Sequence, residues 1–338
     1  MKRLLKKILV PPFASRLVSA VATSFFGRGV PVFLLHRMAS EANHHNGTSA
    51  DHLRACLQYL VDDHYSFISL EDLLLAITKK QPLPEKPVVF TMDDGFLDQA
   101  EVAAPIFLEF NCPLTFFVIS DLLNQNIWPW DAQTSWLIDN TDKDTLVINF
   151  PDEQLHISID HKTCRRSARE LVRNYFKEMD AKHIPTLLQQ LADAAELHLP
   201  ESPPEQYRAL DWAQARTLEK QGVRFAPHSV SHRILSKLDR EAAKHEILDS
   251  WQTLQNELEN PLNVFCYPTG RILDYGPREI DILKQNNFLG AVSTTPGYVE
   301  PNADPAKQLY KIPRFELPDN MADFIQYCSW IEHAKHAS

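Results

Sequence analysis

Short runs of apolar residues alternate with amphipathic stretches along much of the chain. The runs at 32–35, 88–92 and 114–119 contain few polar residues, which is typical of strands buried on both faces of a sheet. Apolar residues recur every three or four positions across 51–62 and 103–110, as they do on one face of a helix. Strands and helices that alternate in this way predict parallel β-α-β units and an α/β fold.

The pattern changes between residues 124 and 210, where charged residues are more frequent. Within this stretch, 145–150 and 155–159 have the pattern of a small hairpin, and 165–198 predicts one or two amphipathic helices. We therefore expect 124–210 to be an insertion or subdomain.

The α/β pattern returns after residue 210. Its predicted strands are 223–226, 264–267, 290–293 and 311–315, and its predicted helices include 277–286. We expect one α/β domain in two parts, 29–123 and 211–318, followed by a C-terminal helix or tail at 319–338.

The first 28 residues form a basic and apolar N-terminal segment that permits three interpretations. Basic residues between positions 2 and 7 precede an apolar stretch, and the segment 20–22, Ala-Val-Ala, is similar to a signal-peptide cleavage site. Pro11, Pro12 and Arg16 interrupt that stretch, so no run reaches the roughly 18 apolar residues of a membrane-spanning helix. We favour an amphipathic helix over 13–26 on a membrane surface, then a packed terminal helix, and last a cleaved signal peptide.

Charge and cysteine usage exclude several classes of protein. The formal net charge is -10 and no basic stripe follows residue 7, which argues against nucleic-acid binding. The five cysteines are odd in number and widely spaced, without a C-x-x-C pair, which argues against a disulfide framework. Reduced cysteines favour a cytoplasmic location, with peripheral contact to the inner face of a membrane through residues 1–28 as an option.

Polar residues collect directly after several of the predicted strands. They are His36 after 32–35, Asp93 and Asp94 after 88–92, His228 after 223–226, and Pro268-Thr269-Gly270 after 264–267. Catalytic groups of α/β barrels lie at the carboxyl ends of several different strands. We therefore expect these residues to meet at one rim of the domain.

The residue types at these strand ends suit a metal site. His228 and His232 are four apart, so one helical turn would point both imidazoles the same way. Together with Asp94 they offer two nitrogen ligands and one oxygen ligand, which leaves a position for water, as in catalytic metal sites. Asp93 would point elsewhere and could act as the base. Each motif is weak alone, since the chain has 14 histidines and Asp-Asp-Gly is often only a turn.

The segments around these residues resemble motifs of the polysaccharide deacetylases, carbohydrate esterase family 4 with NodB homology. The matching segments are Thr91-Met92-Asp93-Asp94-Gly95 for T-F-D-D-G, His228-Ser229-Val230-Ser231-His232 for the second motif, and Phe265-Cys266-Tyr267-Pro268-Thr269-Gly270 for F-x-Y-P-x-G. The segment from Leu34 to Met38 resembles the Y-H-R segment of a branch that contains poly-N-acetylglucosamine deacetylases with permuted motif order. The resemblance runs from about residue 31 to 315, apart from the insertion.

This resemblance implies a distorted (β/α)7 barrel, with the inserted helical and hairpin subdomain, and a divalent metal ion. Zinc is the usual metal, with cobalt, nickel or manganese as alternatives. Asp94, His228 and His232 would be the ligands, Asp93 the general base and His36 the acid that protonates the leaving amine. The implied reaction is hydrolysis of the N-acetyl group of an amino sugar in a glycan, such as a cell-surface polysaccharide, or in a lipid-linked sugar.

The chain also departs from the family pattern. The arginine that orients the base is absent from the third motif, where Cys266 stands, and Arg314 is our candidate for a replacement from another strand. Further candidates for substrate or oxyanion contact are Tyr267, Pro268, Thr269 with its backbone N–H, and Trp130. For Trp130, stacking on a sugar and packing in a core are equally open.

Two alternatives to a deacetylase remain. The same residues could serve a deformylase or another amidohydrolase acting on a lipid-linked sugar, or a phosphoester hydrolase. The chain could also be a non-catalytic carbohydrate-binding relative that keeps the fold. Acetate release from N-acetylated glycans would distinguish these classes.

Overall fold

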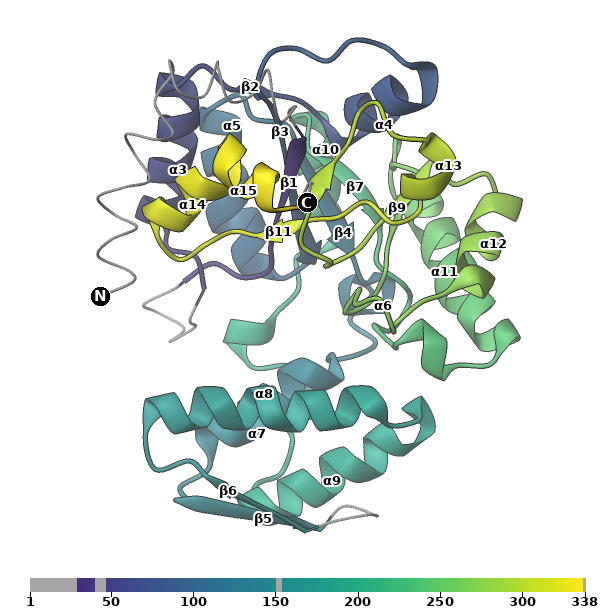
Figure 1. Cartoon of the computed structure of the whole chain (residues 1–338). Coiled ribbons are helices and arrows are strands. Elements are labelled where there is room, and N and C mark those ends of the chain that lie inside the picture. Colours follow the sequence, from purple (N-terminus) through teal and green to yellow (C-terminus); the bar gives the residue numbers. More distant parts are fainter. Residues whose placement is uncertain (1–28, 40–46, 150–153, 337–338) are drawn as a thin grey trace.

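The computed structural model describes residues 29–39, 47–149 and 154–336. The predicted N-terminal segment 1–28 therefore lies outside the described residues. Figure 1 shows an α/β body, built from both ends of the described chain, and a smaller lobe formed by elements from the middle. Within the described ranges, no helix is long and apolar enough to cross a membrane.

A mainly parallel sheet forms the centre of the body. Its neighbouring strands are β1 (Val30–Leu35), β3 (Pro87–Asp94), β4 (Leu114–Val118) and β7 (Arg224–Pro227), all parallel. Every residue of β1, β3 and β4 is buried. This confirms that the apolar runs form strands covered on both faces, and it confirms the α/β fold.

Shorter strands extend this sheet at its edges. β10 (Tyr298–Val299) pairs antiparallel with β1, while β11 (Phe315–Glu316) and β2 (Ser66–Phe67) pair parallel with β1 and β3. β8 (Val264–Cys266) and β9 (Gly290–Val292) form a separate parallel pair. Strand pairing thus defines a seven-stranded sheet and a neighbouring pair, and it does not by itself draw one continuous barrel.

Helices connect the strands of the body and close its ends. They are α3 (Ala50–Asp62), α4 (Leu70–Lys79), the π-helical η1 (Gln99–Ala103), α5 (Ala104–Glu109), α6 (Ser120–Leu123), α10 (Trp212–Lys220), α11 (Arg240–Glu257), α12 (Pro277–Gln285), α13 (Pro305–Gln308), α14 (Met321–Cys328) and α15 (Trp330–His336), with short 3-10 turns η3 (Glu205–Tyr207) and η4 (Leu235–Lys237). Several begin at a polar cap; for example, Ser69 accepts a hydrogen bond from the Asp72 amide at the start of α4.

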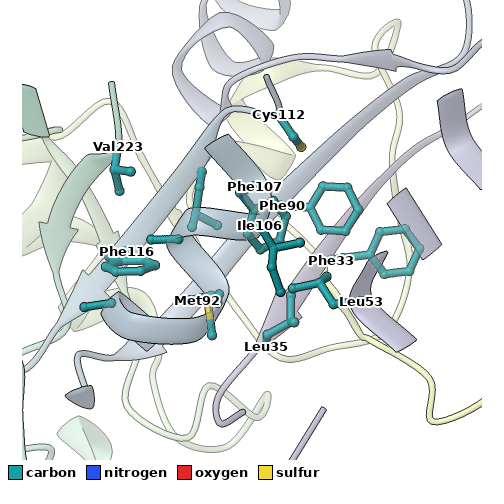
Figure 2. Close-up of a cluster of buried hydrophobic side chains, with 14 of the residues drawn as sticks. Phe33, Leu35, Leu53, Phe90, Met92, Ile106, Phe107, Cys112, Phe116 and Val223 are labelled. Carbon is teal, nitrogen blue, oxygen red and sulfur yellow. The ribbon is translucent and has the colours of Figure 1, made fainter. Parts of the chain in front are cut away.

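The side chains of β1 and β3 alternate between two apolar clusters. Phe33 and Phe90 stack at 5.4 Å and pack with residues of α3 and α5, as Figure 2 shows. Val32 and Val89 face the opposite way and pack with residues of α4, β8 and β9. Because both faces are covered, the sheet is held rigidly, and so are the residues at its carboxyl edge.

The smaller lobe has a hydrophobic core of its own. It consists of α7 (Trp130–Asn140), β5 (Thr145–Asn149), β6 (Gln154–Ser158), α8 (Lys162–Glu178), η2 (Ala181–His183) and α9 (Ile184–Ala195). β5 and β6 pair antiparallel, and the alternating burial of β5 turns one face of this hairpin towards the helices. The lobe thus lies inside the range 124–210, with two helices in the segment where one or two were expected.

Candidate metal centre

The register of the sheet brings the polar strand ends to one edge. Leu35 is paired with Met92, so His36 and Asp93 follow at the same level of neighbouring strands. The Nε2 atom of His36 lies 3.9 Å from Oδ2 of Asp93. The carbonyl of Val118, the residue paired with Asp94, accepts the amide of His228 at 2.9 Å. Three of the four strand ends that were predicted to converge therefore meet at this edge.

Three of these side chains form a compact cluster of possible ligands. Oδ1 of Asp94 lies 3.6 Å from Nε2 of His228 and 3.7 Å from Nε2 of His232. One ligand atom from each residue falls within 4.8 Å of the others, and all three residues are buried. This donor set of two imidazoles and one carboxylate is that of a catalytic zinc site.

The state of these groups fits a divalent cation. Oδ1 of Asp94 is buried and has no hydrogen-bond partner among the residues described. Burial, together with the Asp131 and Asp93 carboxylates, raises the pKa of Asp94 well above its ordinary value. Burial lowers the pKa of His228 to about 3, so this imidazole is neutral and can act as a ligand. A cation between these side chains would stabilise the ionised form of Asp94, which its present surroundings disfavour.

A second group of potential ligands shares His228 with the first. Asp93, His228 and Cys266 also offer ligand atoms within 4.8 Å of one another. However, both carboxylate oxygens of Asp93 accept hydrogen bonds from Arg314. Burial also raises the pKa of the Cys266 thiol well above its ordinary value, which keeps it protonated. The cluster with Asp94 is therefore the better candidate for a metal.

The prediction of a helical turn between the two histidines is wrong. Residues 228–232 form an irregular loop in which Ser229 and His232 have left-handed backbone angles, φ 68 and φ 60. The Ser229 hydroxyl accepts the His232 amide at 2.9 Å, so the loop closes on itself. Asp94, with φ 87, and Thr269, with φ 57, are also left-handed. Four of the eleven non-glycine residues with positive φ in the described ranges therefore follow or end the strands of the site.

Glu246 on α11 holds this loop from outside. Its Oε2 accepts the amides of Val230 and Ser231 at 3.0 and 2.9 Å, and its Oε1 accepts the Ser231 hydroxyl. The Glu246 side chain is buried. A buried carboxylate with three hydrogen bonds fixes the loop far more firmly than its irregular backbone could alone.

Arg314 contacts the proposed base directly. Its Nη1 and Nη2 donate to the two oxygens of Asp93, each at 2.7 Å, and its Nε donates to the Ser293 carbonyl at 2.9 Å. Arg314 also donates to Cys266 and Thr91, and its side chain is fully buried. Burial acts to raise the pKa of Asp93, but Arg314 outweighs it and holds that pKa well below its ordinary range.

A buried glutamine joins two of the strand ends. The amide nitrogen of Gln99, on η1, donates to the carbonyls of His36 and Asp93, and its Oε1 accepts the Gly95 amide. The His36 side chain is 40% exposed, which makes it the most solvent-accessible of His36, Asp93, Asp94, His228 and His232. Nothing in the local sequence pattern marks Gln99 for this role.

The side-chain hydroxyls of Tyr267 and Thr269 are used in hydrogen bonds within the body. The hydroxyl of Tyr267 is directed into the core, where it donates to the Tyr310 carbonyl at 3.1 Å. The Thr269 hydroxyl donates to Asp274, and Pro268 is buried beside it. These two hydroxyls therefore have partners in Tyr310 and Asp274, and oxyanion contact by the backbone N–H of Thr269 stays a prediction.

Trp130 belongs to the core of the lobe. Its ring stacks on Phe176 at 6.0 Å and is 8% exposed. Its indole N–H donates to the His232 carbonyl at 3.3 Å. This placement favours packing over sugar stacking and links the lobe to the metal-ligand loop.

These features define a class of protein: α/β enzymes that carry a carboxylate and two imidazoles at the carboxyl edge of a parallel sheet. A family model, polysaccharide deacetylase, matches residues 80–291, more than half of the chain. The chain therefore belongs to the polysaccharide deacetylase family, and it is a hydrolase that acts on carbon–nitrogen bonds. A comparison with curated protein sequences found no match.

Solved structures support the same fold. The Streptococcus pyogenes deacetylase PplD is 18% identical, with a TM-score of 0.58, and the alignment covers 89% of this chain and 98% of that one. IcaB from Ammonifex degensii is 15% identical, with a TM-score of 0.57 and coverage of 91% and 98%. A de-N-acetylase from Aggregatibacter actinomycetemcomitans is 16% identical, with a TM-score of 0.53 and coverage of 87% and 97%. At these identities the likeness is one of fold.

Proposed function

We propose that this enzyme removes the acetyl group from an N-acetylhexosamine unit of a glycan, and that it needs a divalent metal ion, zinc first. The observation that carries this proposal is the buried and unpartnered Oδ1 of Asp94, which faces the Nε2 atoms of both His228 and His232. These three side chains would hold the ion. When bound, the ion would lower the pKa of a water molecule and polarise the acetamide carbonyl.

Asp93 is the proposed general base. It lies beside the ligand Asp94, and the two hydrogen bonds from Arg314 keep its carboxylate ionised and fixed in orientation. An ionised carboxylate at this position can accept a proton from the attacking water. Arg314, just before β11, would thus take the role that the family pattern gives to an arginine of the third motif.

His36 is the proposed general acid. Its Nε2 lies 3.9 Å from Asp93, while its ring remains partly open to solvent. In the protonated form it can donate its proton to the nitrogen that leaves as a free amine. The base and the acid would then stand at the ends of the adjacent strands β3 and β1. The substrate would bind on the solvent side of both groups.

The proposal extends to the shape of the body, for which we infer a distorted barrel. An amide of Leu262, just before β8, donates to the Phe225 carbonyl of β7 at 2.7 Å. Val292 of β9 forms a parallel bridge with Ile312, and β11 just beyond pairs with β1. These contacts lead from β7 round to β1, with the ligands at one mouth.

Acetate release from N-acetylglucosamine oligomers tests the function. We expect release by the purified enzyme, loss of release with a chelator, and recovery with added zinc. Asp94→Asn and His228→Ala should each lower the rate by more than about 100-fold, because removal of a ligand costs more than removal of its outer partner. His198→Ala, an exposed histidine of the lobe, is the matched control and should keep the full rate.

Three results would separate the alternatives. Full activity in chelator would remove the metal from the mechanism. Release of formate from N-formylated sugars, without acetate from N-acetylated ones, would indicate a deformylase. Sugar binding without release of either acid would indicate a relative that only binds carbohydrate.

A further inference from the structure

The two imidazole ligands differ in what faces their outer ring nitrogen. Nδ1 of His228 lies 2.9 Å from the Cys266 carbonyl, a partner supplied by the body of the fold. Nδ1 of His232 is buried, and among the described residues it has no hydrogen-bond partner. A metal-binding histidine normally donates its second N–H to a carboxylate or a carbonyl, which fixes the tautomer and orients the ring. Nδ1 of His232 would therefore need a carboxylate or carbonyl as its acceptor when the ring binds a metal.

A carboxylate from the lobe faces that nitrogen. Oδ1 of Asp131, in the first turn of α7, lies 3.8 Å from Nδ1 of His232. The preceding residue, Trp130, donates its indole N–H to the His232 carbonyl at 3.3 Å. The start of α7 thus approaches His232 on both its ring and its backbone.

A second helix of the lobe supports the start of α7. Phe176 of α8 stacks on Trp130, the residue before Asp131, with 6.0 Å between the ring centroids. The lobe therefore presents the Asp131 carboxylate on a packed helix.

We propose that Asp131 is a positioning residue for the metal centre: its carboxylate accepts the Nδ1–H of His232 and leaves Nε2 of that ring free for the ion. The separation of Oδ1 and Nδ1 exceeds a hydrogen bond by roughly 1 Å, a gap that a small movement of the carboxylate would close. The inserted lobe is then part of the metal site and supplies a group that the body lacks. This inference rests on the proposed metal-dependent function.

Zinc affinity of the full-length protein, measured by competition with a chromogenic chelator, tests this role without reference to catalysis. We expect Asp131→Asn to bind zinc about 10- to 100-fold more weakly than the wild type, because a neutral amide is a poorer acceptor for the imidazole N–H. Asp131→Glu should recover most of the affinity, since the longer side chain reaches across the same gap. Visible spectra of the cobalt-loaded proteins should change in Asp131→Asn, because the ring of His232 is held less firmly.

A control variant removes a charge from the same lobe without touching the site. Glu170→Gln, on the exposed side of α8, should bind zinc as the wild type does. Equal zinc affinity and equal cobalt spectra for Asp131→Asn and the wild type would overturn the inference while leaving the metal site intact. A wild-type protein that binds no zinc would instead overturn the proposed function itself.

Discussion

At the scale of single residues, the pair of Asp93 and Arg314 is the costliest feature to disturb. Both side chains are buried, and the carboxylate receives two hydrogen bonds of 2.7 Å from one guanidinium. A buried pair adds little net stability over apolar residues, but breaking it leaves a buried charge without a partner. Arg314 thus links the chemistry of the base to the folding of the chain.

Arg314→Met is expected to lower the free energy of unfolding by about 3–5 kcal/mol, because Asp93 would stay buried without its cation. The double variant Asp93→Leu/Arg314→Met should recover much of that loss. Urea denaturation measures both. Arg216→Met, which breaks an exposed pair with Glu257, is the control and should cost less than about 1 kcal/mol. Equal losses in Arg314→Met and the control would contradict this account.

His228 gives the metal-free protein a predictable pH dependence. Its pKa is lowered to about 3 from an ordinary 6.5, so between these values the unfolded chain binds a proton that the folded chain does not. Stability is therefore lost as the pH falls through this window. Between about pH 7 and pH 5 the loss from this residue should be about 2 kcal/mol.

Denaturant midpoints in chelator at both pH values check this expectation. His228→Asn should show a smaller loss than the wild type, since it cannot take up the proton. His198→Asn, which removes an exposed histidine, should behave as the wild type. A wild-type slope that His228→Asn leaves unchanged would count against the buried neutral imidazole.

At the scale of elements, the strand ends could be predicted and the loop between the histidines could not. Buried apolar runs that stop at His36, Asp93 and His228 define both a strand and its end, so their convergence follows from parallel pairing. The loop 228–232 depends on left-handed backbone angles and on Glu246, sixteen or so positions along the chain, and neither has a local signature. Spacing alone therefore suggested a helical turn that is absent.

Glu246→Ala should loosen this loop. The amides of Val230 and Ser231 lose a charged acceptor, and we expect the free energy of unfolding to fall by about 2 kcal/mol or more. Hydrogen exchange at these two amides should rise with it. Glu241→Ala, at the exposed start of α11, is the control, with an expected loss below about 1 kcal/mol. Unchanged exchange at both amides in Glu246→Ala would contradict the role given to this carboxylate.

At the scale of the whole molecule, sequence patterns indicate the α/β class and the extent of the insertion, while contacts between distant parts need the structure. Arg314 was a candidate because Cys266 stands where the third motif of the family has an arginine. The contact itself joins Arg314 to Asp93 across 221 positions of the chain. Asp131 and Gln99 lie on helices, where polar residues are common and nothing in the pattern marks one that contacts a distant part of the chain. Such residues become visible only when the lobe and the body are packed together.

Metal binding should stabilise the whole fold. Zinc at about 100 times its Kd should add about 2.7 kcal/mol and raise the Tm of the stripped wild type by a few degrees. Asp94→Asn should gain much less from zinc. Without metal, Asp94→Asn should melt above the wild type, because it removes a buried carboxylate whose Oδ1 has no hydrogen-bond partner among the described residues. Identical zinc-induced shifts in the two proteins would contradict Asp94 as a ligand.

The left-handed backbone at Asp94, Ser229, His232 and Thr269 has a consequence for engineering. Each such residue costs on the order of 1 kcal/mol, and all four stand at the reactive edge. A library selected only for survival of heating would accumulate glycine or asparagine at these positions and drift towards inert proteins. A library selected for acetate release would keep the left-handed residues at this edge. Its stabilising substitutions would lie at the opposite end of the strands.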